Sequence, residues 1–426
     1  MLDRKIAPLI KDAVEFDLHL KPYQKLILDN GIEVYTIDAG EQEVVQLEIV
    51  FYAGSSFEKN YGVASATSYM LKNGTSTKTA FDINEHFEYY GGYCNRSCQN
   101  ETATVSLHTL TKHLSVLLPV VKEMITDSIF PEEELAIYQQ NSKQKLSVNL
   151  KKCDFVANRL IDTYLFGEHH PYGKYLVAAD FDALTTAQLK DHFKQYYVNG
   201  HCVIFVAGKL PENLHKLLNE QFGQLTIQAG QAPIPASIVV PAVIKKYRIN
   251  NDENGVQGAI RIARPFPNRH HPDFMEMMVL NTVFGGFFGS RLMSNIREDK
   301  GYTYGIHSYV QNQLTDTALM ISTEAGKEVA EATVEEIYKE MKILREELID
   351  EEELLLVRNY LIGSILGDLD GPFHIIGRWK NIILNNLEGQ YFYDSINMIK
   401  NISAEELKAL ANKYLKPEDF YELVVI

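Results

Sequence analysis

The sequence has little cysteine and no long apolar run. Its 426 residues include only four cysteines, Cys94, Cys98, Cys153 and Cys202, whose spacing fits neither a disulfide framework nor a paired zinc motif. We therefore expect reduced, structural thiols. No stretch approaches the roughly 18 apolar residues of a membrane span, and the charged segment Met1–Asp12 lacks the apolar run of a signal peptide. The sequence predicts a cytoplasmic protein with no membrane partner.

Positive charge is also scarce. Lysine and arginine total 41 against 56 aspartates and glutamates, which gives a net charge of −15. Because no basic tract is present to neutralise phosphates, a nucleic-acid or anionic-membrane partner is excluded. The apolar fraction of 46% is ordinary for a globular protein. A chain of this length exceeds what one hydrophobic core usually supports, so we expect at least two domains.

Self-contained hydrolytic motifs are missing as well. None of the thirteen histidines lies in an H-E-x-x-H or H-x-x-E-H arrangement. No Gly-x-Ser-x-Gly elbow is present, and no cysteine has a recognisable nucleophile context. The glycine cluster Gly285–Ser290 lacks the Gly-Lys-Ser/Thr ending of a phosphate loop. Two interpretations of this cluster stay open, a turn between helices and a mobile loop at the mouth of a cleft.

An internal repeat is the strongest organisational signal. Phe130–Tyr138 and Ile349–Val357 each open a helix with three consecutive glutamates. Leu184–Tyr197 and Ile402–Leu415 follow at nearly the same offset, and each is a Thr- or Ser-capped helix that precedes an apolar strand. Two motifs in the same order at one spacing indicate a duplication.

The repeat sets the expected domains. Residues 226–243 are proline-rich and lack a helical period, which predicts an extended linker between an N-terminal lobe, 1–225, and a C-terminal lobe, 244–426. In each half, paired strands precede a run of helices and a final strand. Tyr302–Gln313 and Thr317–Glu324 are expected to pair as a hairpin. This order predicts an α+β fold of two homologous lobes, each a mainly antiparallel sheet with helices on one face.

The segment Ser290–Tyr304 carries the most specific chemistry. It predicts a helix end, a Lys-Gly turn and a tyrosine-rich strand, with Arg297 and Tyr304 on opposite sides of the turn. A guanidinium can hold a peptide carbonyl, and a phenol can donate to a developing oxyanion. From spacing alone, the favoured interpretation of the pair is a helix-end arginine and a strand tyrosine, with Tyr302 as the tyrosine most easily confused with Tyr304.

Several segments together resemble the pitrilysin/insulinase family of zinc metallopeptidases, from about Asn30 to the C-terminus. Active members of that family carry their H-x-x-E-H helix, a Gly-Gly turn, a His-Pro-Tyr-Gly segment and an arginine-tyrosine motif in this order. The corresponding segments here are Tyr61–Thr75, Tyr90–Asn95, His170–Gly173 and Ser290–Tyr304. The first of them ends in the same Gly-Thr as in the family.

The departures from the family pattern concern the metal. The two histidines and the glutamate of the family motif are replaced by Ser65, Ser68 and Tyr69, none of which is a good zinc ligand at neutral pH. The resemblance places the third ligand, a glutamate, on the helix after Pro131. That position, around Gln139–Gln140, is vacated too, because no Asp or Glu occurs from residue 135 to 152.

The resemblance implies a zinc-less subunit of a heterodimeric peptidase, similar to mitochondrial processing peptidase and to bacterial two-subunit homologues. Such a chain binds no metal itself, is inactive alone and closes the chamber of a homologous zinc-bearing partner that cleaves unstructured peptides. Arg297 would orient the substrate and Tyr304 would stabilise the oxyanion. In isolation the chain could form a homodimer. Two alternatives are a structural homologue, resembling core subunits of respiratory complexes, and a peptide-binding module that captures chains by strand addition.

Overall fold

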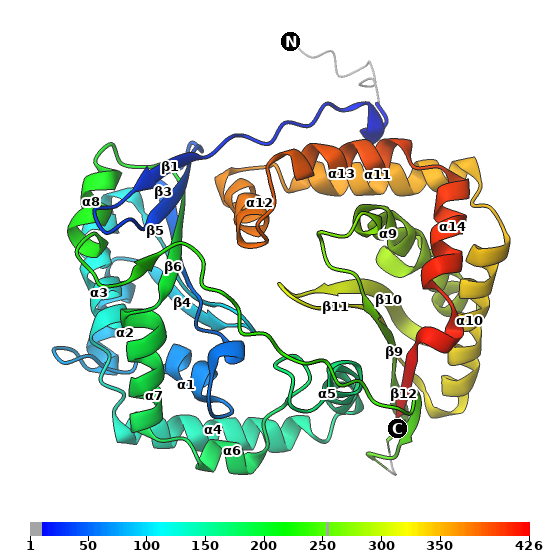
Figure 1. Ribbon diagram of the computed structural model, residues 1–426, viewed down its shortest axis with the longest axis horizontal. Coiled ribbons are helices and arrows are strands. Elements are labelled where there is room, and N and C mark those ends of the chain that lie inside the picture. Colours follow the sequence, from blue (N-terminus) through cyan, green and yellow to red (C-terminus); the bar gives the residue numbers. More distant parts are fainter. Residues whose placement is uncertain (1–10, 253–254) are drawn as a thin grey trace. The chain divides into compact units, whose positions relative to one another are not determined.

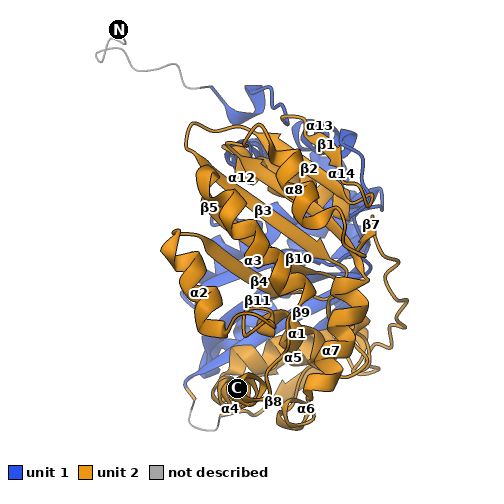
Figure 2. Ribbon diagram, turned by 90° about the vertical axis from the view of Figure 1, so that its left-hand side faces the viewer, with its two compact units in different colours: residues 1–20, 256–370, 385–422 blue, residues 21–255, 371–384, 423–426 orange. Residues whose placement is uncertain are grey.

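The computed structural model describes residues 11–252 and 255–426, which form two compact units (Figure 1). Both units are discontinuous in sequence, as the two colours of Figure 2 show. Unit 1 contains the described residues of 1–20, 256–370 and 385–422, and unit 2 contains those of 21–255, 371–384 and 423–426. The predicted lobes, 1–225 and 244–426, and the linker between them stay a prediction.

Unit 2 is built on a seven-stranded sheet. Its order is β1 (Gln24–Ile27), β2 (Glu33–Asp38), β6 (His201–Gly208), β3 (Val44–Phe51), β5 (Ala103–Leu110) and β4 (Tyr93–Cys98), with β7 (Gln228–Ala229) beside β6. The β2–β6 and β6–β7 pairs are parallel, and the other pairs are antiparallel. Strand β4 therefore forms one edge of this sheet.

Helices complete unit 2. They are α1 (Val63–Met70), α2 (Ala80–Tyr89), α3 (Leu114–Thr126), α4 (Glu132–Asn149), α5 (Cys153–Phe166), α6 (Ala178–Asp182), α7 (Thr186–Phe193), α8 (Leu214–Phe222) and α12 (Pro372–Leu384). Helix α12 packs against β2 and β6 although its sequence neighbours belong to unit 1. The single tryptophan, Trp379, fixes it there by donating from Nε1 to the carbonyl of Lys21 at 2.8 Å.

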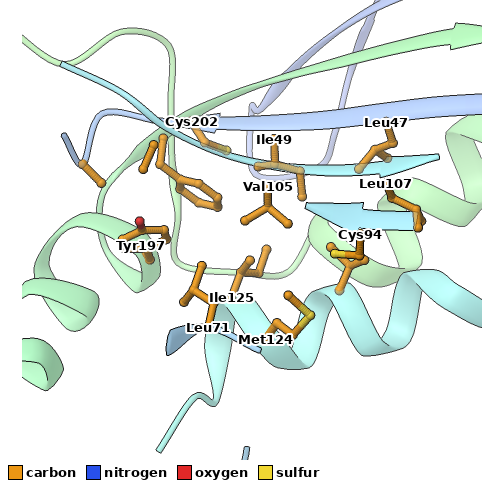
Figure 3. Packing of buried hydrophobic residues seen from close by; sticks show 14 of the residues in the cluster. Leu47, Ile49, Leu71, Cys94, Val105, Leu107, Met124, Ile125, Tyr197 and Cys202 are labelled. Carbon is orange, nitrogen blue, oxygen red and sulfur yellow. The ribbon is translucent and has the colours of Figure 1, made fainter. Parts of the chain in front are cut away.

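The core of unit 2 follows from the alternation of β3 and β5. Leu47 lies opposite Leu107, and Ile49 lies opposite Val105. All four side chains are buried, and Figure 3 shows them in one apolar cluster with residues of α3 such as Met124. Each fully buried aliphatic side chain contributes about 1.5–3 kcal/mol, so this cluster holds the sheet and α3 together.

Unit 1 is built on three antiparallel strands, β9 (Gln257–Phe266), β10 (Thr303–Asn312) and β11 (Thr317–Gly326). They lie in a five-stranded sheet of order β10-β11-β9-β12-β8, completed by β12 (Tyr421–Val425) and β8 (Lys246–Ile249). The predicted hairpin is β10–β11. The helical elements of unit 1 include α9 (Asp273–Asn281), the π-helical turns η5 (Thr282–Gly286) and η6 (Met293–Asp299), α10 (Ala330–Glu346), α11 (Glu351–Gly367), α13 (Gln390–Asn401) and α14 (Ala404–Tyr414).

The predicted α+β class is confirmed: two mainly antiparallel sheets carry the helices. The repeated helix starts are also present. Thr185 caps α7 with Gln188, and Ser403 caps α14 with Glu406, each in a reciprocal capping box. Each capped helix leads into a strand, β6 or β12. Among the described residues, no helix has both the length and the apolar composition that crossing a bilayer requires.

Candidate functional site

The predicted arginine-tyrosine pair is in direct contact in unit 1. Arg297 lies in the last turn of η6, and a turn at Lys300–Gly301 leads into β10. Gly301 has a φ of +66°, a left-handed conformation that favours glycine. The Nε group of Arg297 donates a hydrogen bond to the backbone carbonyl of Tyr304 at 3.0 Å. The turn therefore folds the arginine back onto the start of the strand.

A β-bulge directs the Tyr304 side chain outward. Thr303 pairs with Ala325 and Ile306 pairs with Thr323, so the strand register shifts between these pairs. A bulge of this kind interrupts the ladder and redirects the intervening side chains. The Tyr304 side chain is 95% exposed. Simple alternation, which would place Tyr302 and Tyr304 on one face, does not apply, because Tyr302 precedes the strand.

A surface pocket of about 520 Å³ adjoins the pair. Its walls come from the η6–β10 turn and from the facing ends of β9 and β11. They comprise Gln257, Arg297, Gly301, Tyr302, Thr303, Tyr304, Glu324, Ala325 and Gly326. Arg297 and Tyr304 thus line one pocket together with the ends of β9 and β11.

The other contacts of Arg297 leave most of its donors available. Its guanidinium carbon lies 4.6 Å from the ring centre of Phe288, which is itself 62% exposed. A cation–π contact at such a site is worth about 0.5–1 kcal/mol. Nη1 lies 3.6 Å from the exposed carboxylate of Glu298, a surface ion pair that contributes little.

Helix α10 anchors η6 through two carboxylates. Asn295 donates from Nδ2 to Glu336 at 3.0 Å and to Glu340 at 2.7 Å, and Lys300 pairs with Glu336 at 3.4 Å. Burial raises the pKa of Glu340. Burial acts in the same direction on Glu336, but hydrogen bonds from Asn295 and Lys339 and the charge of Lys300 outweigh it and lower that pKa. At neutral pH, Glu336 is the firmly ionised member of the pair.

The glycine cluster before the motif packs tightly. Gly285 lies in η5, and a Cβ at this position would meet Ser308 Oγ at 2.7 Å and Leu292 Cδ1 at 2.8 Å. Arg291, which follows the cluster, forms a bidentate pair with Glu353 at 2.8 and 2.7 Å. The first half of the cluster is therefore a packed turn, which favours the first of the two interpretations. Exposed Phe288 is the part that extends toward Arg297.

The three vacated ligand positions lie together on α1 in unit 2. Ser65 is half-buried, Ser68 is buried and Tyr69 is 43% exposed. Ser68 donates from Oγ to the carbonyl of Ser97 on β4 at 3.3 Å. The short helix thus presents two hydroxyls and a phenol where the sequence comparison predicted a replaced metal motif.

The position facing them on α4 differs from the expected one. Gln139 turns away and donates from Nε2 to the carbonyls of Phe181 and Leu184 at 2.8 and 3.0 Å. Tyr138 faces α1 instead, with its ring centre 4.9 Å from that of Tyr69. Burial raises the pKa of Tyr138 to about 12, so this phenol stays neutral at physiological pH.

Two family models match the chain over most of its length. The model described as insulinase (peptidase family M16) matches residues 33–170. The model described as the peptidase M16 inactive domain matches residues 183–361. The chain belongs to the M16 family.

Relatives and solved structures agree with this assignment. An uncharacterized zinc protease of Bacillus subtilis, YmxG, is 24% identical over 398 residues, which cover 92% of this chain and 95% of that protein. The crystal structure of a peptidase M16 inactive domain from Pseudomonas fluorescens matches with a TM-score of 0.84 and 25% identity, covering 95% of this chain and 98% of that one. A protease from Helicobacter pylori has the same fold at 16% identity, with a TM-score of 0.84 and coverage of 95% and 99%.

The side chains of this M16 chain do not fit a zinc ion at α1. Zinc in proteins is bound by imidazole, thiolate and carboxylate groups, whereas Ser65, Ser68 and Tyr69 offer hydroxyls and a neutral phenol. Across residues 11–252 and 255–426, no group of three His, Cys, Asp or Glu could hold a metal. The guanidinium of Arg96 also lies 5.4 Å over the ring of Tyr69, and its charge disfavours a second cation there. The side chains of α1 therefore do not form a zinc site in unit 2.

Sequence reasoning missed three residues at these sites. Phe288 contacts Arg297, while Tyr138 and Arg96 both contact Tyr69. One signal for Arg96 was available, because it alternates with Cys94 and Cys98 and so is the one charged residue on an otherwise thiol-lined strand face. Which residue of α4 faces α1 depends on helix rotation, which composition does not determine.

Proposed function

We propose that this chain is the non-zinc subunit of a heterodimeric M16 metallopeptidase and supplies Arg297 and Tyr304 to peptide hydrolysis. The observation that carries the proposal is the arrangement of this pair. Arg297 holds the backbone of Tyr304, and the phenol is 95% exposed. A tyrosine displayed in this way suits a group that acts on a molecule outside its own unit.

Tyr304 would act as a hydrogen-bond donor. Hydrolysis of a peptide bond passes through a tetrahedral intermediate with a negatively charged oxygen. A phenol O–H placed against this oxygen lowers the barrier, and loss of one such donor typically reduces the rate by about 100- to 1,000-fold. In the proposed complex, zinc in the homologous partner activates the attacking water.

Arg297 would bind and orient the substrate. One of its five N–H donors is used on the carbonyl of Tyr304, Nη1 lies near the exposed Glu298 carboxylate, and Arg297 lines the pocket. These donors suit the carbonyl oxygens of an extended peptide. Because orientation contributes to the barrier as well as to binding, loss of Arg297 should affect both kcat and KM.

The vacated positions on α1 support the division of labour. Ser65, Ser68 and Tyr69 do not suit zinc, while Arg297 and Tyr304 are both present, and α10 binds the η6 turn that carries Arg297 through Asn295. Inactivity of the isolated chain, a zinc-bearing partner and unstructured peptide substrates follow as parts of the same proposal. The cytoplasmic location stays a prediction.

Reconstitution tests the proposal. The chain is mixed with a homologous subunit that carries H-x-x-E-H, and cleavage of a quenched fluorescent peptide is followed. We expect no cleavage by this chain alone, cleavage by the mixture, and strong losses for Tyr304→Phe and Arg297→Ala. Tyr302→Phe is the matched control and should retain activity. Full activity of mixtures with both site variants would contradict the assigned roles.

The second candidate is a peptide-binding protein without a proteolytic role. Strand β4 lies at the edge of its sheet, and Tyr93 on it is 63% exposed. Edge strands can accept an extended peptide by strand addition. Peptide binding by this chain, together with no change in cleavage by any zinc-bearing homologue, would favour this candidate.

A further inference from the structure

Arg96 lies at the vacated ligand positions without a carboxylate partner. It is on β4, between Cys94 and Cys98 on the strand face shared by alternate residues. Its Nε atom is buried and donates no hydrogen bond. Within the described part of the chain, its guanidinium makes no ion pair, and its one ring contact is with Tyr69 at 5.4 Å.

Two other largely buried arginines of this chain are paired with carboxylates. Arg264 lies 2.9 Å from Asp419, and Arg291 binds Glu353 in bidentate fashion at 2.8 and 2.7 Å. Removing an ion from water destabilises a fold unless a counter-charge or hydrogen bonds compensate. The cation–π contact with Tyr69 compensates only part of this cost at Arg96.

A second cation lies close by. Lys72, just after α1, donates from Nζ to the carbonyl of Cys94 at 3.3 Å and lies 5.3 Å from the ring centre of Phe87. Burial lowers its pKa, and the charge of Arg96 lowers it further. Lys72 forms no salt bridge with a described carboxylate, although the charge of Glu88 acts on it. Two cations without a salt bridge among the described residues thus lie on either side of Cys94, in a protein whose net charge is −15.

We propose that Arg96 and Lys72 form a carboxylate-binding site on unit 2 that takes an acidic side chain or the carboxyl terminus of a bound peptide. The planar guanidinium matches a carboxylate in bidentate geometry, and a half-buried location strengthens the interaction. The position at the edge of the sheet allows an extended peptide to approach along β4. Tyr69, on which the guanidinium of Arg96 stacks, is itself 43% exposed.

This site is separate from the proposed function. It uses Lys72, just after α1, and Arg96 of β4 in unit 2, whereas Arg297 and Tyr304 lie in unit 1. A binding measurement on the chain alone tests the carboxylate site, whereas cleavage assays with a zinc-bearing subunit test the role of Arg297 and Tyr304. A negative result in one experiment therefore leaves the other proposal standing.

The experiment measures binding of three fluorescein-labelled peptides to the full chain by anisotropy. The first contains glutamates and ends in an amide. The second replaces each glutamate with glutamine, and the third is the glutamine peptide with a free carboxyl terminus. Arg96→Met removes the charge at similar volume. Arg159→Met is the matched control, because Arg159 also stacks on a tyrosine, Tyr175 at 4.1 Å, but donates to the carbonyl of Leu176.

We expect the glutamate peptide or the free-carboxyl peptide to bind at least about tenfold more tightly than the amidated glutamine peptide. Tighter binding of the glutamate peptide indicates an acidic side chain as the ligand, and tighter binding of the free-carboxyl peptide indicates a carboxyl terminus. Arg96→Met should abolish this preference, Lys72→Met should reduce it and Arg159→Met should keep it. The Arg96→Met protein should unfold at the same temperature as the parent or higher, since an unpaired charge is removed.

Equal binding of all three peptides, no binding, or a preference that persists in Arg96→Met would overturn the proposal. A lower unfolding temperature of Arg96→Met with unchanged binding would make Arg96 a structural cation and overturn it as well.

Discussion

The guanidinium of Arg297 donates from Nε to the backbone carbonyl of Tyr304 at 3.0 Å, so one member of the pair holds the strand segment that displays the other. The turn at Gly301 and the bulge after Thr303 make this contact geometrically possible. The pair is therefore one local unit. Its geometry depends on backbone features that can be perturbed without touching either side chain.

Gly301 is the first such feature. Its φ of +66° disfavours a Cβ, although the space around it is open. Gly301→Ala should lower the free energy of unfolding by about 1–2 kcal/mol. Gly301→Asn should cost less, because asparagine tolerates the left-handed region. Urea denaturation measures both variants, and an alanine variant as stable as the parent would contradict the strain argument.

Gly285 and Gly363 form a second comparison. A Cβ at Gly285 would meet Ser308 and Leu292 at 2.7–2.8 Å, whereas a Cβ at Gly363 in α11 would meet nothing within 4 Å. Gly285→Ala should destabilise by about 1–3 kcal/mol through overpacking. Gly363→Ala should stabilise by roughly 0.5–1 kcal/mol through helix propensity. Thermal unfolding midpoints should move in opposite directions, and a shift in the same direction would refute the packing argument.

Burial raises the pKa of Glu340, so the stability contributed by this carboxyl should decrease as the pH rises. A carboxyl with a raised folded-state pKa stabilises the fold most below its ordinary value of 4.5, and this contribution is lost as the pH rises through the folded-state pKa. Glu340→Gln keeps an acceptor for Asn295 and should stabilise at neutral pH by roughly 1 kcal/mol. Its advantage should vanish near pH 4. An advantage that grows on acidification would contradict this account.

His192 on α7 carries the opposite pH dependence. It is buried, its Nε2 lies 3.1 Å from the carbonyl of Ala53, and burial lowers its pKa from 6.5 to about 4. The unfolded chain binds the proton first, so stability should fall by up to about 3 kcal/mol as the pH drops from 6.5 to 4. His192→Gln retains a donor to Ala53 and should flatten this decline. Unchanged slopes between pH 6.5 and 4 would disprove the assignment.

Much of the fold was accessible from the sequence because its signals are local. The capping residues Thr185 and Ser403, the β10–β11 hairpin and the Lys300–Gly301 turn each depend on neighbours within a few positions. The contact between Arg297 and Tyr304 follows from that turn, and was therefore predictable as a juxtaposition.

The remaining features depend on tertiary packing. Helix α12 joins unit 2 through Trp379 and Lys380, contacts that span more than half the chain. Tyr138 rather than Gln139 faces α1, because the rotation of α4 decides it. The bulge that exposes Tyr304 requires the register of β11. No local pattern carries these relationships.

The turnover number of the reconstituted complex at saturating peptide tests the central claim most directly. Tyr304→Phe should lower kcat by about 100- to 1,000-fold with little change in KM, because the phenol donates mainly in the transition state, while Tyr302→Phe should leave both parameters near those of the parent. A Tyr304→Phe complex with the same kcat as the parent complex would contradict the account.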